Sequence, residues 1–476
     1  MADEHDMPAL VLCAPRLRAA RRVRVLSDVQ VAAAAGDVVT VEGANGSGKS
    51  TLLAAAAGVL PAGPASHRPA TVGYAPERAD VLPRLTVRRW LTGLARSAGL
   101  SRDESAKQVD QALSRIGLAS AAATPLRDLS RGNAQRALVA QATLGPPGLV
   151  VLDEPAGGLD EDGLGRVTGL IRWLAGQSSV VLVARHPSAP LPLPAGPAWQ
   201  LSDGAVRAGV RPAPVTSPGT LSPASTAVST GGPASAGGPA GTASQPRAGQ
   251  PGGPERAGGL ERLGHGAAHR ARVLVTSQWF AAPALVFLAI LAILYAGPAG
   301  PPLPAAAFTA AMLAPVMTWV TVLAQLADGR MAGRAFAAHV GGRGRAQLAA
   351  TLATAPFALV AVIVAVALAA SRQPAGQITA LVVLEAIVLH LAAAVFGAGV
   401  GTLLAPPVIT QPGWRVLTGV ALYLALILVR VSPLRPLLIV AENAGSGPTV
   451  VAATLLLAGI GAVLAALTVC LADRLP

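Results

Sequence analysis

Apolar and polar positions divide the chain into two halves of different character. In residues 1–210, short apolar runs such as "VVTVEG", "GLVVLDEP" and "VVLVARHP" alternate with longer stretches of mixed polarity, and two of the runs end in charged residues. Short buried strands that alternate with helical segments are typical of an α/β domain. Beyond residue 271 the apolar runs become long and charged residues become rare. The pattern therefore predicts an α/β domain followed by an all-α membrane domain.

Six long apolar runs follow residue 271, and we interpret them as membrane-spanning helices. Most approach the roughly 20 residues that a helix needs to cross about 30 Å of hydrocarbon, although the first and the fifth are short. Lipid offers no partner to an unpaired backbone group, so helix is the expected conformation. The runs are Trp279–Ala296, Pro304–Ala327, Gln347–Ala370, Thr379–Ala405, Val416–Val431 and Pro448–Leu471.

The two halves are joined by residues 211–270, which consist mainly of Pro, Gly, Ala, Ser and Thr. Such a segment buries too little apolar surface to offset its ordering entropy, so we expect a flexible linker. The predicted organisation is thus a soluble domain over residues 1–210, the linker, and a six-helix transmembrane domain over residues 271–476.

The distribution of charge favours a membrane protein over a nucleic-acid-binding protein. The formal net charge is +13, but aromatic residues make up only 3% of the chain. Surplus arginine lies in the linker and beside apolar runs, for example at Arg330, Arg334, Arg343 and Arg345 between the second and third runs. By the positive-inside rule, we expect a multi-pass protein of the cytoplasmic membrane with its soluble domain in the cytoplasm. We expect no nucleic-acid partner.

The two cysteines, Cys13 and Cys470, lie far apart in the chain. We therefore expect neither a disulfide framework nor a cysteine metal cluster. The first residues are acidic and lack a long apolar core, which is unlike a secretory signal. This agrees with a soluble domain that remains in the cytoplasm.

The soluble half carries a phosphate-binding loop. The stretch "VVTVEGANGSGKSTLL" is a β-branched strand, a glycine-rich loop and the start of a helix, and Gly43 to Ser50 fit the phosphate-loop pattern. Glycines let backbone N–H groups approach phosphate oxygens, and the helix N-terminus adds partial positive charge. We expect Lys49 to reach the β- and γ-phosphates of ATP and Ser50 to hold Mg²⁺. The expected nucleotide-binding residues of this loop are Gly43, Asn45, Gly46, Ser47, Gly48, Lys49, Ser50 and Thr51.

Two further strands end in residues that suit ATP hydrolysis. Asp153 and Glu154 emerge at the end of "GLVVLDEP". We expect Asp153 to position Mg²⁺ and Glu154 to polarise the water that attacks the γ-phosphate. The run "VVLVARHP" brings His186 to a strand end, where a histidine is more often structural but could here contact the γ-phosphate.

The order of these motifs resembles the ATP-binding cassette of ABC transporters over roughly residues 10–210. The phosphate loop is followed by "LSRGN" at residues 129–133, then by "VVLDEP", "GGLD" and "ARH". A phosphate loop alone fits many NTPases, whereas five motifs in this order are highly specific. The resemblance implies a P-loop NTPase fold in which ATP lies between two cassettes. Ser130 and Gly132 of one cassette would then bind the γ-phosphate of ATP held by the other.

The same resemblance assigns Asp160 to the D-loop and His186 to the switch histidine. It also implies that residues 101–126 form the helical subdomain that meets the membrane domain. Glu77 stands where the family's Q-loop has glutamine, in a form that looks like the "PEER" variant. A glutamate there could still bind Mg²⁺ or contact water, so Glu77 joins the expected nucleotide and metal ligands.

The cassette departs from the family pattern in two further places. Arg131 and Asn133 replace the usual Gly and Gln of the signature loop, although the phosphate-facing Ser130 and Gly132 are kept. No aromatic residue precedes the phosphate loop to stack on adenine. A slow ATPase is compatible with these departures.

Six spans on one cassette imply a half-transporter, which a second copy of the chain or a paired half-transporter would complete. The arginine-rich segment after the second run resembles the coupling helix of exporter-type permeases, but a simple positive-inside anchor explains it equally well. The leading hypothesis is ATP-driven export of a hydrophobic or amphipathic small molecule by a homodimer. The alternative is a membrane-anchored ABC ATPase that acts as a regulatory switch without transport.

Two ionisable residues interrupt the fourth apolar run. Glu385 and His390 lie within it, and ionisable groups in hydrocarbon are costly and tend to be functional. The favoured interpretation is that each is hydrogen-bonded to neighbouring helices. Gly397 and Gly401 in the same run have the spacing of a close helix–helix contact.

Overall fold

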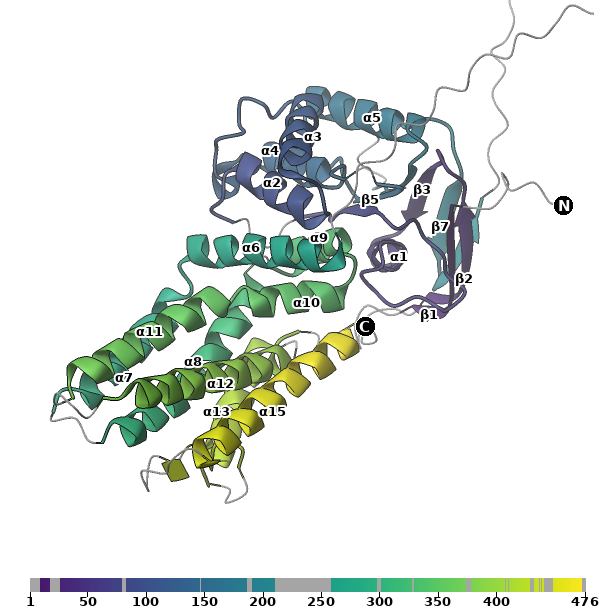
Figure 1. Ribbon diagram of the computed structural model, residues 1–476. Helices are drawn as coiled ribbons and strands as arrows, with labels where there is room; N and C mark the ends of the chain where they lie inside the picture. Colours follow the sequence, from purple (N-terminus) through teal and green to yellow (C-terminus); the bar gives the residue numbers. More distant parts are fainter. Residues whose placement is uncertain are drawn as a thin grey trace, which may run out of the picture.

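The computed structural model has two stacked parts, an α/β domain and a helical domain (Figure 1). The fold class predicted from the sequence is confirmed at this level. The structure describes residues 9–17, 26–78, 83–145, 147–185, 191–209, 258–297, 301–327, 329–373, 378–406, 408–409, 411–428, 432–435, 437, 439–440 and 448–472.

The α/β domain is built on a six-stranded sheet with the strand order β4-β5-β6-β3-β7-β8. The first five strands in this order, β4, β5, β6, β3 and β7, are parallel. Strand β8 pairs with β7 in antiparallel orientation. Strands β5 and β6 are buried along their whole length, as expected of parallel strands covered on both faces. Strands β1 and β2 form a separate antiparallel pair. The strands are β1 (Leu10–Leu17), β2 (Leu26–Ala33), β3 (Val38–Gly43), β4 (Val72–Ala75), β5 (Leu149–Asp153), β6 (Val180–Ala184), β7 (Ala198–Ser202) and β8 (Ala205–Ala208).

Helices complete the α/β domain on both sides of the sheet. Helix α1 follows β3 and packs into the apolar cluster of β1, β2 and the sheet. Helices α2, α3 and α4 gather to one side of the sheet (Figure 1), and α3 begins with a capping box between Ser101 and Glu104. The helices are α1 (Lys49–Ala56), α2 (Val87–Ser97), α3 (Arg102–Arg115), α4 (Arg131–Gln141) and α5 (Glu161–Gly176), with the 3-10 turn η1 at Leu126–Asp128.

The helical domain begins with α6 at Gly259, within the segment 211–270 that the sequence predicts to be a linker. Residues 210–257 lie outside the described residues, so the expected linker stays a prediction. The helices are α6 (Gly259–Ser277), α7 (Ala281–Leu294), α8 (Pro302–Leu326), α9 (Gly329–Val340), α10 (Arg343–Leu352), α11 (Ala355–Ser371), α12 (Ala380–Leu404), α13 (Pro412–Leu428) and α15 (Pro448–Ala472).

Four helical segments in the described part of the chain are long and apolar enough to cross a membrane. Helices α6 and α7 bend by 77° between them and count as a fifth candidate if they are taken together, whereas α13 is shorter. Each of the six predicted runs coincides with helical residues, but helix length supports four or five spans, and a six-span domain stays a prediction. The four long segments are Pro302–Leu326, Arg343–Ser371, Ala380–Leu404 and Pro448–Ala472.

Helix α9 packs into the α/β domain rather than among the membrane helices. Phe336 belongs to the apolar cluster that contains α2 and α4 of the α/β domain, and Ala335 belongs to the cluster that contains β4. His339 is buried, and its Nε2 atom lies 2.9 Å from the carbonyl oxygen of Gln141 in α4. The arginine-rich segment after α8 therefore contains a helix that docks onto the α/β domain. It is more than a charged anchor, and α9 is called the docking helix below.

Helix α6 forms the second contact between the two parts, and it packs against α9 and α2. The ring of His269 stacks on Phe336 with 5.8 Å between ring centroids, and the Arg270 guanidinium lies 4.3 Å from the centroid of Phe336. Gly93 of α2 leaves room for this contact, because a Cβ atom there would lie 2.0 Å from Nδ1 of His269. At the far end of α6, Gln278 accepts a hydrogen bond of 2.7 Å from Arg84.

Small residues bring the membrane helices close together, as the sequence predicts for Gly397. A Cβ atom at Gly397 would lie 2.2 Å from the carbonyl oxygen of Ala314, so α12 and α8 touch through their backbones. His390 of α12 is also structural, because its Nδ1 lies 2.7 Å from Ala386 O and its Nε2 lies 2.9 Å from the Thr309 hydroxyl. The interpretation that His390 is hydrogen-bonded within the helix bundle is confirmed.

Replacement of the Phe336 side chain in the docking helix α9 by alanine is expected to destabilise the whole protein. Phe336 is 1% exposed and contacts residues of both parts, so Phe336→Ala should lower the free energy of unfolding by about 3–5 kcal/mol. The measurement is the thermal unfolding midpoint of the intact chain in detergent. Phe308→Ala, at a position 40% exposed on α8, is the matched control and should change the midpoint little. Equal shifts for the two variants would contradict the docking described above.

Candidate nucleotide-binding site

The phosphate loop connects β3 to α1 and requires glycine at both of its ends. Gly43 has φ 156°, and a Cβ atom there would lie 2.7 Å from the carbonyl oxygen of Leu201. Gly48 is the N-cap of α1 with φ 108°, a conformation that residues with side chains rarely adopt. The loop therefore turns its backbone N–H groups and the N-terminus of α1 towards one point, an arrangement that binds phosphate.

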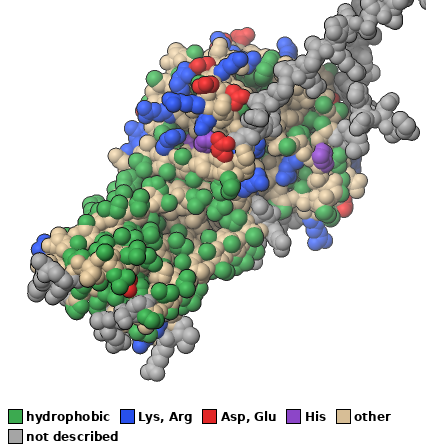
Figure 2. Space-filling model, viewed as in Figure 1, with side chains coloured by type: hydrophobic (Ala, Val, Ile, Leu, Met, Phe, Trp, Pro, Cys, Tyr) green, Lys and Arg blue, Asp and Glu red, His purple; other side chains and the backbone are tan. Residues whose placement is uncertain are grey.

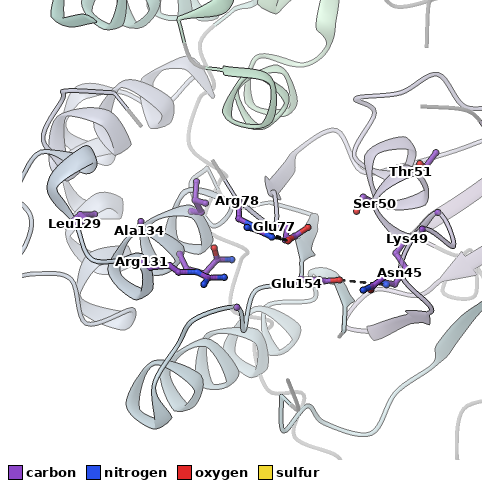
Figure 3. A pocket seen from close by; sticks show the side chains of 15 residues that line it. Asn45, Lys49, Ser50, Thr51, Glu77, Arg78, Leu129, Arg131, Ala134 and Glu154 are labelled. Carbon is purple, nitrogen blue, oxygen red and sulfur yellow. Dashed lines mark hydrogen bonds and ion pairs between the residues drawn. The ribbon is translucent and has the colours of Figure 1, made fainter. Parts of the chain in front are cut away.

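Lys49 lies at the start of α1 with its ammonium group at the mouth of the loop. The Nζ atom donates a 2.9 Å hydrogen bond to the carbonyl oxygen of Gly43 and lies 3.8 Å from a carboxylate oxygen of Glu154. Figure 3 shows this ion pair and the neighbouring side chain of Asn45. The lysine predicted to bind phosphate thus lies beside the carboxylate predicted to polarise water.

Asp153 is the last residue of β5, two strands away from the strand that leads into the phosphate loop. It is buried and its pKa is raised to about 6, chiefly by burial; a hydrogen bond from Ser50 opposes this rise, and the charges of Glu154 and Glu77 add to it. Since the carboxyl ends of parallel strands share one edge of the sheet, the fold itself brings Asp153 to Ser50.

The group at Asp153 fits a magnesium ion. Its Oδ1 atom is buried and has no hydrogen-bond partner among the described residues, while Ser50 supplies a hydroxyl oxygen beside it. Carboxylate and hydroxyl oxygens are the ligands that Mg²⁺ accepts together with phosphate oxygens. Ser50 and Asp153 would therefore hold the ion, which would neutralise negative charge on the phosphates of ATP.

Glu154 follows directly after β5 in a left-handed conformation with φ 49°. This conformation is uncommon for a residue with a side chain and occurs preferentially at functional sites. It turns the carboxylate away from the strand direction and towards Lys49, as Figure 3 shows. The side chain is about one fifth exposed, so water can reach it.

A cavity of about 1000 Å³ opens between the phosphate loop and the start of α4. Asn45, Lys49, Ser50 and Thr51 lie on one side of it, and Arg131 extends from the other side (Figure 3). The cavity brings together most of the residues predicted from the phosphate loop with the predicted water-polarising carboxylate. Its walls are formed by Asn45, Gly46, Gly48, Lys49, Ser50, Thr51, Glu77, Arg78, Leu129, Arg131, Ala134, Gln135, Leu138, Glu154 and Gly157.

Glu77 lines the same cavity, and its carboxylate is paired with Arg78 at 3.0 Å. This pair neutralises the glutamate that stands in the Q-loop position. Arg78 and Gln135 are site residues that the sequence did not predict. The buried Nε2 atom of Gln135 has no hydrogen-bond partner among the described residues. Arg78 could have been predicted because it directly follows Glu77 in the sequence. Gln135 could not, because its position in the cavity depends on how α4 packs.

The residues predicted to contact nucleotide bound to the other cassette have structural roles within their own cassette. Ser130 caps α4 by accepting a hydrogen bond from Asn133 N at 3.3 Å. Asp160 caps α5 in the same way, with a bond of 2.9 Å from Gly163 N. Gly132 approaches the backbone of the D-loop segment, because a Cβ atom there would lie 3.0 Å from Gly158 O. Their contacts with nucleotide stay predictions.

His186 lies outside the described residues, so its proximity to the γ-phosphate stays a prediction. Ser47 is described and buried, and its Oγ atom has no hydrogen-bond partner within the described ranges although it lies beside the loop backbone. That orphan hydroxyl is compatible with the predicted contact to phosphate.

Comparison with known proteins identifies the domain that carries this site. Residues 26–157 match the family model described as ABC transporter. The N-terminal domain is an ABC-type ATP-binding cassette. The matched model ends at residue 157, so the membrane helices lie outside it.

The cassette has curated relatives that are named as zinc import ATP-binding proteins. It is 44% identical over 162 residues to the zinc import ATP-binding protein ZnuC of Cereibacter sphaeroides, which covers 32% of this chain and 63% of that protein. It is 37% identical over 167 residues to the protein of the same name from Paramagnetospirillum magneticum, covering 34% and 62%. The chain thus spans less than two thirds of the length of these relatives. A solved ATP binding subunit of an ABC transporter is 22% identical, with a TM-score of 0.38, covering 42% of this chain and 89% of that chain.

Replacement of the phosphate-loop lysine is expected to abolish nucleotide binding. Lys49→Ala removes the only charged donor that the phosphate loop itself places at its mouth, so ATP hydrolysis should fall by about 10²–10³-fold. The measurement is ATP binding and phosphate release by the purified chain. Lys107→Ala, at an exposed position of α3, is the matched control and should leave both unchanged. A Lys49→Ala variant that binds ATP normally would remove the phosphate site assigned here.

Replacement of Glu154 is expected to separate binding from hydrolysis. Glu154→Gln keeps the size of the side chain but cannot polarise water as a base, so hydrolysis should fall by at least about 10²-fold while ATP still binds. Binding is measured with a fluorescent ATP analogue, and hydrolysis by phosphate release from the same preparation. Hydrolysis at the wild-type rate would assign the base to another residue.

Proposed function

We propose that this protein couples ATP hydrolysis in its cassette to the movement of a small hydrophobic or amphipathic molecule across the cytoplasmic membrane. The observation that carries the proposal is the seating of α9 in the cassette, because it connects the nucleotide-binding domain directly to the membrane helices. A cassette without such a contact could hydrolyse ATP but could not move the membrane domain.

The chain's own residues supply the steps of hydrolysis. The backbone N–H groups of the phosphate loop and Lys49 bind and orient the phosphates, and Glu154 accepts a proton from the attacking water. Bound Mg²⁺ would supply charge neutralisation on the phosphates, and Ser50 and Asp153 would hold it. Glu77 would contact the ion or the water from the Q-loop position, and His186 would contact the γ-phosphate.

A homodimer would complete the site. In the proposed arrangement, Ser130 and Gly132 of one copy contact the γ-phosphate of ATP bound by the other copy, and Asp160 lies at the junction. Support comes from the position of the signature loop, which begins α4 beside the large cavity and leaves its polar residues at the surface of the domain. A paired half-transporter of the same type would serve equally in place of the second copy.

ATP can drive the motion only if it binds the closed pair of cassettes more tightly than the open pair. Closure would shift α4 and α2 relative to the sheet. Since α9 packs against both regions, closure would pull on α8 and α10, which flank α9 in the chain. Hydrolysis would remove the γ-phosphate contacts and allow the pair to reopen.

Export is the proposed direction, because a cassette followed by membrane helices resembles the half-transporters that export hydrophobic compounds. A second candidate is zinc import, which is favoured by the names of the curated relatives. Those relatives share the cassette, whereas the transported molecule is recognised in the membrane domain. The two directions are therefore separated by a transport measurement rather than by the cassette.

Transport by reconstituted vesicles tests the proposal. With ATP on the cassette side, wild-type chain should move fluorescent amphipathic compounds across the membrane, and Glu154→Gln should reduce the rate by at least about 10²-fold, in parallel with hydrolysis. A radioactive zinc assay in the same vesicles tests the second candidate. ATP hydrolysis without movement of any compound would instead support a membrane-anchored regulatory ATPase.

A further inference from the structure

A cavity of about 720 Å³ lies in the membrane domain at the end remote from the cassette. It is formed by the N-terminal turns of α8, α12 and α15, where Leu303, Leu381, Val450 and Leu455 contribute apolar walls. These three helices all begin at this end and run towards the cassette (Figure 1). The volume falls in the range of small-molecule binding sites, which is about 300–1,000 Å³.

One charged side chain lines this apolar cavity. Glu385 lies in the second turn of α12, about 8 Å along the helix axis from Ala380. Within the described part of the chain, its carboxylate makes no hydrogen bond or ion pair. His390, which is about one turn further along α12, is hydrogen-bonded to Ala386 and Thr309 instead of to Glu385. The interpretation that Glu385 is hydrogen-bonded to neighbouring helices is thus wrong for the described residues.

A lone carboxylate in apolar surroundings is costly unless a cation accompanies it. The cavity is open towards the lipid, since Leu381 and Leu455 on its rim are 63% and 69% exposed. Figure 2 shows that hydrophobic side chains cover most of this face of the helical domain, while charged ones gather on the cassette. A molecule that reaches Glu385 from the membrane must therefore be apolar over most of its surface.

The N-terminal ends of three helices surround the cavity. These ends carry partial positive charge that favours an anionic side chain nearby. Thr454 of α15 adds a hydroxyl whose buried Oγ1 atom finds no hydrogen-bond partner in the part of the chain that the structure describes. Glu385 thus offers carboxylate oxygens and Thr454 a hydroxyl oxygen at the wall of an otherwise apolar space.

We propose that this cavity binds an amphipathic organic cation, with its apolar body against the leucine and valine side chains and its positive group at Glu385. The inference rests on the proposed transport function in taking this cation to be the transported class. A divalent metal fits the cavity poorly, because in the described residues no group of three or more His, Cys, Asp or Glu side chains comes together to hold one. The charge of Glu385 and the shape of the cavity select a cation with a large apolar body.

Two probes of equal shape and opposite charge test the proposal by binding alone. Wild-type chain in detergent, without ATP, should bind tetraphenylphosphonium and should bind tetraphenylborate much more weakly. Glu385→Gln should weaken tetraphenylphosphonium binding about tenfold or more, because the charge-assisted contact is lost. Glu385→Asp keeps the charge and should restore most of the affinity. Equal binding by wild type and Glu385→Gln would overturn the proposal, and so would equal binding of the two probes.

A second pair of variants tests the cavity without altering its charge. Leu381→Trp fills space at the rim and should weaken tetraphenylphosphonium binding, whereas Leu424→Trp, at a 55% exposed position of α13, should not. Equal effects of the two tryptophans would show that the cation binds elsewhere on the apolar surface, or that ordinary lipid occupies the cavity. Because binding is measured without ATP, this outcome is independent of the vesicle experiment. If wild-type chain binds tetraphenylphosphonium in detergent but transports no compound in vesicles, the proposed function is wrong and the cation site is retained.

Discussion

The packing of α9 into the cassette is the interaction on which the rest of the molecule depends. Phe336 enters the apolar cluster shared with α2 and α4, while Ala335 enters the cluster shared with β4. Burial of one large apolar side chain stabilises by about 1.5–3 kcal/mol, and close-packed interiors transmit displacement instead of absorbing it. If β4 moves relative to α2 and α4, the movement must therefore either displace α9 or break this contact.

The same region of the sheet serves both the nucleotide site and the docking helix. Tyr74 is fully buried in β4, and its pKa is raised by burial and then by the charge of Asp153, with Arg334 of α9 acting in the opposite direction. The carbonyl oxygen of Tyr74 accepts a 3.3 Å hydrogen bond from Gln141, whose own carbonyl faces His339. A tyrosine side chain thus lies within electrostatic reach of a predicted magnesium ligand and of the membrane-linked helix. A change of charge beside Asp153 would therefore act on Tyr74, which lies next to the docking helix α9.

The parts of this structure that depend on local chemistry could be predicted from the sequence, and the parts that depend on tertiary contact could not. The phosphate loop and the strand that ends at Asp153 have motifs whose conformation is fixed by glycine and by burial. The start of α6 at Gly259 was missed because it lies at the end of a segment whose Pro, Gly, Ala, Ser and Thr content predicts a linker. That helix is held by packing of residues such as Val273 against the cassette. The partnerless state of Glu385 likewise depends on what neighbouring helices fail to supply.

Helix α8 links the far cavity to the cassette without a break. Its 25 residues extend about 37 Å, from Leu303 at the cavity to the turn before α9, and Ala327 already belongs to a cassette cluster. Gly397 holds α12, which carries Glu385, against the middle of the same helix through backbone contact. A shift of α8 would therefore act both on its N-terminal turn at the cavity and on α12, which carries Glu385. In the proposed transporter, the nucleotide state of the cassette would thus influence the shape of the cavity beside Glu385.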